Sequence, residues 1–430
     1  MKHITSETNF GSSRRKFLQR LSVGSLATLA LPSLAAVSKN NSVALPTRPE
    51  VLDEQYWQLV KKQFTVPDNL IMLNAANLCP SSFAISDKVL AMNRELNSNV
   101  SFQYRSAFTV QRVKALTQLA QFVGVSRGEI GITRNTSESN CILVNGLDFK
   151  TGDEIIIWDQ NHPSNGVAWE KRAQRSGLVV KKVSLPASPR AKEELITPFA
   201  KAITSRTKLI AFSHVSNLSG IALPAKEICH LAKSKEILSL VDGAQTLGLM
   251  DLNLYDMGCD FFTASTHKWL MGPMENGMLY VSKSHIESLW PSVIGGGWKD
   301  DTQTVDEKIC VLGQRIETTT SALPEAIDFQ LSIGKKVIEE RVVALNIYLK
   351  EQIRSKISSA TFVTPLSPDV SAGIVIINIS GKDSKDVYQK LYDNYGVACS
   401  STGGIRLSPH IYNTMEDIDK VVRALAALAV

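Results

Sequence analysis

Between about residues 70 and 285, short apolar runs alternate with longer stretches of mixed polarity. The runs are rich in β-branched and aromatic side chains and predict strands at 129–133, 153–158, 208–213, 238–241, 260–264 and 277–281. The stretches between them predict helices at 137–147, 165–176 and 224–235. Nearly continuous apolar strands between helices are typical of a mostly parallel sheet covered on both faces. Functional groups in such sheets gather beyond the carboxyl ends of the strands.

The carboxy-terminal part of the chain predicts a smaller module. Apolar residues at helical spacings over 322–357 predict a long helical stretch. The segments that follow predict a strand, a helix, a strand and a final helix, at 373–379, 383–395, 396–399 and 415–429. We therefore predict an α/β fold. It has a large domain at 73–310, with a mostly parallel sheet sandwiched by helices, and a small C-terminal α+β domain at 311–430.

Composition is that of a globular protein and narrows the function classes. The chain has 430 residues, of which 44% are hydrophobic and 20% charged, and a formal net charge of +6. These values exclude collagen, long disordered chains and disulfide-dense mini-domains. No apolar run is long enough for a polytopic membrane protein. A basic balance spread over a whole domain would favour nucleic acid, but most of this excess lies in one short segment.

That segment, residues 1–36, has the three-part layout of a secretory signal. A basic start leads into an apolar stretch and then a small-residue exit. Arg14 and Arg15, followed by Lys-Phe-Leu, resemble a twin-arginine signal. We expect export to the periplasm through the twin-arginine machinery, with residues 37–72 as a linker and N-terminal arm. An uncleaved anchor, or a basic terminus ahead of a surface helix, remains an alternative.

The six cysteines are widely scattered along the chain. None forms a C-x-x-C pair, so a zinc ribbon or a thioredoxin-like motif has no support. The scatter favours buried thiols, which behave as small hydrophobic residues. Disulfides stay open as an alternative, because an exported protein permits them.

Two charged residues stand where predicted strands end. Lys268 follows the strand 260–264 in Ser-Thr-His-Lys-Trp, and its amine could form a Schiff base with an aldehyde in a partly apolar site. The alternative is a solvated loop lysine. Asp242 follows the strand 238–241, and a buried carboxylate there needs a cation or donors. A protonated pyridine nitrogen would supply the positive charge. The alternative is that Asp242 is the N-cap of the following helix.

A third segment, 133–139, connects a predicted strand to a predicted helix. Its hydroxyls, including those of Thr136 and Ser137, and the free N–H groups of a helix N-terminus could bind a phosphate. An ordinary capping box would have the same residue types. The segment therefore indicates a phosphate site only in combination with the segments of Lys268 and Asp242.

These pieces occur in one chain order that resembles the class V aminotransferase family of pyridoxal-phosphate enzymes. That family contains cysteine desulfurases and isopenicillin N epimerase. The resemblance covers about residues 70–425 and rests mainly on Ser-Thr-His-Lys and Val-Asp-Gly-Ala-Gln. It implies pyridoxal 5'-phosphate as cofactor, the aspartate aminotransferase-like architecture called fold type I, and a homodimer with the site at the subunit boundary.

The resemblance also assigns roles to single residues. Lys268 would hold the cofactor and carry the proton at the substrate's Cα. Asp242 would pair with the pyridine nitrogen, and His162 would stack on the ring and take part in catalysis. Gln245 and Asn217 would lie near the ring 3-oxygen. The phosphate contacts would be Thr136, Ser137, Ser265, His267 and, toward the neighbouring subunit, Thr318.

Near the carboxy terminus, Arg406 resembles the arginine that clamps the substrate carboxylate, a task for which its planar fork is suited. Two departures from the family pattern stand out. The long loop with a nucleophilic cysteine that desulfurases carry is absent, because Cys399 lies just before Arg406 and ends a predicted strand. Family members usually show Gly-Thr where this chain has Glu317 and Thr318.

Together these features predict an exported pyridoxal-phosphate enzyme of the aminotransferase type. It would act on an amino group of an amino acid or a peptide-like substrate. Epimerisation and a desulfurase-type C–S lyase elimination are the alternatives within the family, and a non-catalytic binding protein on the same scaffold is the alternative outside it. Export together with this cofactor also resembles the enzymes of pyoverdine siderophore maturation, which tailor a peptide side chain. No metal and no nucleic-acid partner is expected.

Overall fold

The computed structural model describes residues 48–50 and 52–430. The predicted signal at 1–36 lies outside these ranges, as do residues 37–47 and 51 of the predicted linker and N-terminal arm. None of the helices within the described part has the length and apolar character needed to span a bilayer. The predicted division into domains at 310/311 stays a prediction.

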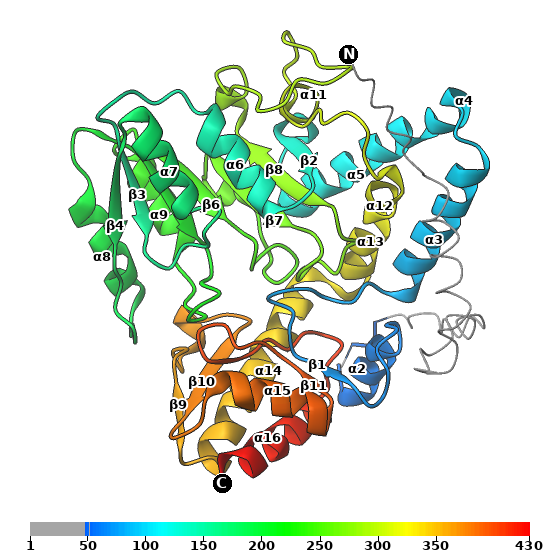
Figure 1. The fold of residues 1–430 in the computed structure, drawn as a ribbon, viewed down its shortest axis with the longest axis vertical. Helices are drawn as coiled ribbons and strands as arrows, with labels where there is room; N and C mark the ends of the chain where they lie inside the picture. Colours follow the sequence, from blue (N-terminus) through cyan, green and yellow to red (C-terminus); the bar gives the residue numbers. More distant parts are fainter. Residues whose placement is uncertain (1–47, 51) are drawn as a thin grey trace, which may run out of the picture. The chain divides into compact units, whose positions relative to one another are not determined.

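A seven-stranded sheet forms the centre of the described chain (Figure 1). Its strands are β2 Ile130–Thr133, β3 Glu154–Trp158, β4 Val179–Val183, β5 Thr207–Ser213, β6 Leu238–Asp242, β7 Phe261–Ser265 and β8 Gly277–Val281. They are ordered β2-β8-β7-β6-β5-β3-β4. Only β8 runs antiparallel to its neighbours. The other adjacent pairs are parallel, which confirms the predicted mostly parallel sheet.

Helices cover both faces of this sheet because its buried strands are apolar on both sides. Along β3, Ile155 and Ile157 belong to one hydrophobic core and Ile156 and Trp158 to another. The first core is completed by α6 Thr136–Gly146, α7 Val167–Ser176 and α11 Val305–Ile309. The second is completed by α5 Ala107–Val123, α8 Lys192–Ala202, α9 Ala225–Lys233, α10 Leu254–Met257 and α13 Leu323–Ile333.

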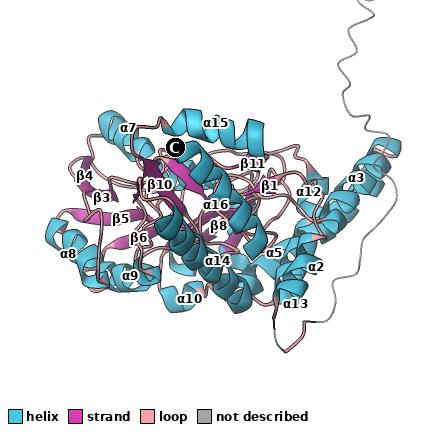
Figure 2. Ribbon diagram, turned by 90° about the horizontal axis from the view of Figure 1, so that it is seen from below, coloured by secondary structure: helices cyan, strands magenta, loops and turns pink. Residues whose placement is uncertain are grey.

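The carboxy-terminal residues build a second, three-stranded antiparallel sheet, ordered β12-β10-β9. Its strands are β9 Ala360–Phe362, β10 Val375–Ile379 and β12 Ile405–Leu407. The helices α14 Lys335–Lys356, α15 Ser384–Tyr395 and α16 Met415–Ala429 pack with it around one hydrophobic core (Figure 2). This arrangement matches the smaller α+β module that the sequence predicts.

The predicted helical stretch over 322–357 is interrupted once. The structure has two helices, α13 and α14, which meet at Gly334. Gly334 has φ 102°, a backbone conformation that side chains with a Cβ rarely adopt. The apolar spacing continues across this break, so periodicity alone could not reveal it.

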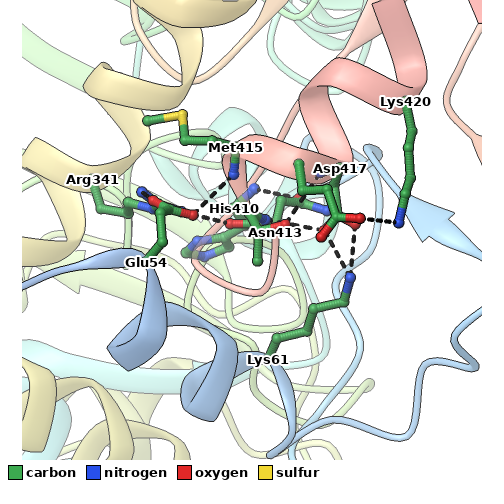
Figure 3. A network of polar contacts seen from close by, with 10 residues as sticks. Glu54, Lys61, Arg341, His410, Asn413, Met415, Asp417 and Lys420 are labelled. Atoms are coloured by element: carbon green, nitrogen blue, oxygen red, sulfur yellow. Dashed lines mark hydrogen bonds and ion pairs between the residues drawn. The ribbon is translucent and has the colours of Figure 1, made fainter. Parts of the chain in front are cut away.

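The N-terminal arm docks against the start of the last helix. On α2 Glu54–Lys61, the amine of Lys61 lies 2.8 Å from both carboxylate oxygens of Asp417 (Figure 3). Glu54 accepts a hydrogen bond from the backbone N–H of Met415 and pairs with Arg341. Further along the arm, β1 Ile71–Met72 pairs in parallel with β11 Val397–Ala398. The arm is therefore held by residues near the other end of the chain.

Candidate active site

The sequence-predicted site residues gather at the carboxyl edge of the seven-stranded sheet. Asp242 ends β6 and Ser265 ends β7, with Lys268 in the turn that follows. Thr136 begins α6 directly after β2. Because these strands run in the same direction, their carboxyl ends share one edge, where ligands bind in such sheets.

A cavity of about 240 Å³ lies at this edge. It is lined by Asn135, Thr136, Ser137, His162, Ser213, Val215, Asn217, Asp242, Ala244, Gln245, Ser265, His267 and Lys268. This lining contains every residue that the sequence predicts to contact the cofactor, except Thr318. Segments spread over more than 130 positions of the chain thus converge on one space.

One end of the cavity is built from hydroxyl groups and the first turn of α6. Asn135 caps the helix by accepting a hydrogen bond from the N–H of Glu138. The backbone N–H of Thr136 donates to Ser265 Oγ at 2.9 Å, and the two hydroxyls lie 2.6 Å apart. His267 Nδ1 is buried without a hydrogen-bond partner among the described residues. Hydroxyls, a helix N-terminus and an unpaired ring nitrogen are suited to a phosphate.

Asp242 provides a buried negative charge in the same cavity. Its side chain is almost fully buried, and neutral groups hold it: Asn140 Nδ2 donates to Oδ2 at 2.9 Å and the N–H of Ala244 donates to Oδ1 at 3.1 Å. Within the described part of the chain no basic side chain forms an ion pair with it. A buried carboxylate with neutral donors alone fits a ligand that brings a positive charge, such as a protonated pyridine ring.

Lys268 provides an amine that loses its proton more easily than that of an ordinary lysine. Burial lowers the pKa of this lysine to about 8, and Arg406 acts in the same direction, whereas Asp242 and Cys79 oppose the shift. The amine has no hydrogen-bond partner among residues 48–50 and 52–430. A neutral, unpaired amine is a nucleophile toward an aldehyde. The cavity therefore offers the amine, the carboxylate and the phosphate-binding groups that pyridoxal 5'-phosphate requires.

His162 lines the cavity after β3. Its backbone N–H donates to Ser213 Oγ at 3.4 Å, and its Nδ1 lies 2.9 Å from Ser164 Oγ. Partial burial lowers the pKa of His162, Lys268 lowers it further, and Asp242 opposes the shift. The imidazole is therefore neutral at physiological pH.

Gln245 and Asn217 both line the cavity, with part of their polar groups already engaged. Gln245 donates from Nε2 to the carbonyl of Ala76 at 2.9 Å and accepts at Oε1 from the indole N–H of Trp269 at 2.8 Å. One amide hydrogen of Gln245 stays free for a ligand oxygen. The backbone carbonyl of Asn217 accepts from Arg406 at 3.3 Å.

Arg406 places a buried positive charge beside the cavity. It stands on β12 and is 4% exposed, and its Nη2 reaches Asn74 Oδ1 at 3.5 Å. Its Nε is buried without a partner within the described ranges. Burial lowers the pKa of Arg406 to about 10, and Cys399 opposes the shift. A buried guanidinium with an unused N–H is suited to a carboxylate ligand.

The remaining sequence-predicted residue lies elsewhere. Thr318, on α12 Glu317–Ser321, is buried, and its hydroxyl donates to Asn93 Oδ1 at 2.8 Å. It does not line the cavity of its own chain. The role predicted for it concerns a second subunit and stays a prediction.

Several residues at the site were missed by sequence reasoning, foremost Asn140 and Ser164. Asn140 is fully buried on α6, one helical turn after Thr136. This spacing places both residues on one face of the helix and could have revealed Asn140. Ser164 contacts both His162 and Asn140, a meeting that only the folded chain shows.

Sequence comparison finds relatives over nearly the whole described chain. The profile of the family described as Aminotransferase class-V matches residues 82–421. Isopenicillin N epimerase of Streptomyces clavuligerus is 27% identical over 397 residues, covering 86% of this chain and 98% of that protein. A probable cysteine desulfurase of Halalkalibacterium halodurans is 30% identical over 402 residues, covering 85% and 96%.

Solved structures agree on the fold. The apo structure of a cysteine desulfurase from Thermococcus onnurineus NA1 has a TM-score of 0.78 at 24% identity, covering 86% of this chain and 97% of that one. The cystine C-S lyase C-DES, in complex with cysteine persulfide, has a TM-score of 0.77 at 20% identity, covering 84% and 98%. The architecture is therefore fold type I, as the resemblance implied.

Proposed function

Because the chain belongs to the class-V aminotransferase family, it is a pyridoxal 5'-phosphate-dependent enzyme, and we propose that it acts on the primary amine of an amino acid or peptide-like substrate. The observation that carries this proposal is the unpaired amine of Lys268, with a pKa of about 8, in one cavity with the buried carboxylate of Asp242. A binding protein that had lost the cofactor would need neither group.

The cavity residues divide the task of holding the cofactor. Asp242 suits the ring nitrogen, while Thr136, Ser137 and Ser265 suit the phosphate. When bound, pyridoxal 5'-phosphate withdraws electrons from the carbon that carries the substrate amine. The protein contributes the charge beside the ring and the orientation of the substrate.

Two further residues act on the substrate. The amine of Lys268 takes the proton from the carbon beside the amino group and returns one, because a pKa near the working pH serves both directions. Arg406 holds a carboxylate of the substrate with its unused N–H. An amino acid, or a peptide-like molecule with a carboxylate near its amine, satisfies both residues.

We propose an aminotransferase-type reaction, with epimerisation as the second candidate because of the relatives of that name. Both begin with the same proton removal. A desulfurase-type elimination that relies on a reactive thiol is disfavoured by Cys399. This residue is buried just after β11, and burial raises the pKa of its thiol to about 12. A thiol needs a lowered pKa to act as a nucleophile at neutral pH.

Mass spectrometry of candidate amines, incubated with cofactor-loaded protein, tests the reaction. Aminotransfer predicts a keto product that accumulates only when a keto-acid acceptor is renewed. Epimerisation predicts unchanged mass and a change in chiral analysis, and elimination predicts a smaller fragment without an acceptor. Lys268→Ala serves as the control, with a loss of about 10²-fold or more. A variant as active as the parent protein would overturn the proposed role of Lys268.

We further propose that the enzyme is exported and tailors a peptide siderophore. The basic, apolar and small-residue sections of residues 1–36 support export. Replacing Arg14 and Arg15 by lysine should retain the protein in the cytoplasm, as cell fractionation would measure. Siderophore precursors should change mass on incubation with the loaded enzyme. Turnover of free amino acids alone, with the precursors unchanged, would contradict this substrate.

A homodimer is our proposal for the assembly. Large apolar side chains are exposed along the segment from α3 Phe83–Ser98 through α4 Phe102–Arg105 to α5, among them Val100, Val110 and Phe102, which is 86% exposed. Such side chains on neighbouring helices are typical of a protein interface. Light scattering should give twice the chain mass, and Phe102→Asp should lower it. An unchanged mass would place the interface elsewhere.

A further inference from the structure

We propose that Asn140 and Ser164 are positioning residues that connect the carboxylate of Asp242 to His162 and keep the proton of His162 on Nε2. This inference deepens the proposed function, on which it rests. Its evidence is a continuous chain of hydrogen bonds beneath the cavity. None of the resemblances described above assigns a role to either residue.

The hydrogen bonds of Asn140 determine the orientation of its amide. Asp242 Oδ2 can only accept, so the group 2.9 Å from it must be the NH₂ of Asn140. The carbonyl of the same amide then faces Thr263, whose hydroxyl donates to it at 2.7 Å. The second hydrogen of the NH₂ group is directed to Ser164 Oγ at 3.1 Å. Both N–H donors and the carbonyl oxygen of this fully buried side chain have partners in this one orientation.

Ser164 transmits this orientation to His162. Because Ser164 Oγ accepts from Asn140, its own hydrogen is free to donate to His162 Nδ1, which lies 2.9 Å away. The backbone N–H of Ser164 also donates to Nδ1, at 3.3 Å. Two donors on one ring nitrogen require that nitrogen to be an acceptor. The proton of the neutral imidazole is therefore on Nε2.

The opposite tautomer would break this arrangement. A hydrogen on Nδ1 would oppose the backbone N–H of Ser164, and the serine hydroxyl would lose its acceptor. The protonated imidazole would meet the same two donors. The charged groups near the ring are Asp242, which favours protonation, and Lys268, which disfavours it.

The consequence concerns the division of labour at the proposed site. With Nδ1 occupied and Nε2 protonated, His162 can stack and donate a hydrogen bond, but it has no free lone pair with which to remove a proton. Lys268 is then the base at the substrate. This assignment narrows the catalytic role predicted for His162 to that of a donor.

NMR titration of the full chain, labelled with ¹⁵N-histidine and measured before cofactor is added, tests the proposal. His162→Gln identifies the resonance. The ring nitrogen shifts should show the proton on Nε2, and Ser164→Ala should raise the midpoint of the His162 titration by about 0.4 to 1 pH unit, the worth of one hydrogen bond. Asn140→Ala should raise this midpoint as well. In a chain that already carries Ser164→Ala, the further substitution Asn140→Ala should leave the midpoint unchanged.

Asn145→Ala is the matched control, because Asn145 lies on the same helix with an exposed side chain that bonds the carbonyl of Cys141 and the guanidinium of Arg175, and no residue of the proposed hydrogen-bond chain. Its titration should equal that of the parent protein. A proton on Nδ1, or an unchanged midpoint in a folded Ser164→Ala protein, would overturn the proposal. If the midpoints shift as expected while no amine is converted, the proposed function alone fails.

Discussion

The lowered pKa of Lys268 has a consequence for how the enzyme takes up its cofactor. Only the neutral amine attacks an aldehyde. With a pKa of about 8, roughly one quarter of the lysine is neutral at pH 7.5. A lysine with the ordinary value of 10.5 would be neutral in about one molecule in a thousand. Incorporation of pyridoxal 5'-phosphate should therefore be about 10²-fold faster than for an exposed lysine.

The measurement is the rate at which the visible absorbance of the bound cofactor develops in cofactor-free protein, followed from pH 6 to 10. The rate should rise with pH, with a midpoint near pH 8, and level off above about pH 9. Two substitutions should move the midpoint in opposite directions. Asp242→Asn removes a charge that raises the pKa of Lys268 and should lower the midpoint, whereas Arg406→Gln removes a charge that lowers it and should raise the midpoint.

Lys350 provides an internal control for the site of attachment. Burial lowers the pKa of this lysine to about 8 as well. Its amine, however, donates to Pro365 and Leu366 carbonyls and to the hydroxyl of Ser371. Borohydride trapping and peptide mapping should find the cofactor on Lys268 and not on Lys350. A rate that keeps rising toward pH 10, or label on Lys350, would refute the reasoning from burial.

Three further outcomes concern stability, all measured by urea unfolding. Gly334→Ala should cost about 1–3 kcal/mol, because alanine disfavours φ 102°. Burial alone would raise the pKa of Glu154, but contacts led by Lys181 hold this pKa at about 2, below its ordinary 4.5. The ionised Glu154 stabilises the fold fully above about pH 4.5, and this stabilisation is lost toward pH 2. Glu154→Gln should therefore make the free energy of unfolding depend less on pH in this range. Lys61→Met should cost about 1–3 kcal/mol by leaving a buried carboxylate unpaired, whereas the exposed Lys420→Met should stay within about 0.5 kcal/mol.

The sequence predicted the central sheet well, because its strands carry their own signal. Buried parallel strands are apolar throughout, so β3, β5, β6 and β7 could be located to within a residue or two. The site followed from them, since Asp242 and Lys268 stand where strands end. Strand β4 was missed because Lys181 and Lys182 interrupt its apolar run, as its place at the edge of the sheet permits.

What sequence reasoning could not supply are the contacts between segments far apart. Gln245 lines the cavity with one amide hydrogen free, but the contacts with Ala76 and Trp269 that orient its amide could not be foreseen. Asn140 and Ser164 have ordinary polar side chains whose importance depends on each other's position. No local pattern encodes such a meeting, because hydrogen bonds between distant segments are formed only in the folded chain.

The docking of α2 on α16 has a consequence for the order in which the protein is made. Lys61 and Asp417 are separated by 356 positions along the chain. A ribosome therefore completes the arm long before it makes the residues that hold it. Tyr56 and Trp57 pack in one hydrophobic core with residues as late in the chain as Ile411 and Tyr412, so their packing is incomplete until these residues emerge. The arm can therefore dock only after residues that are synthesised much later have folded.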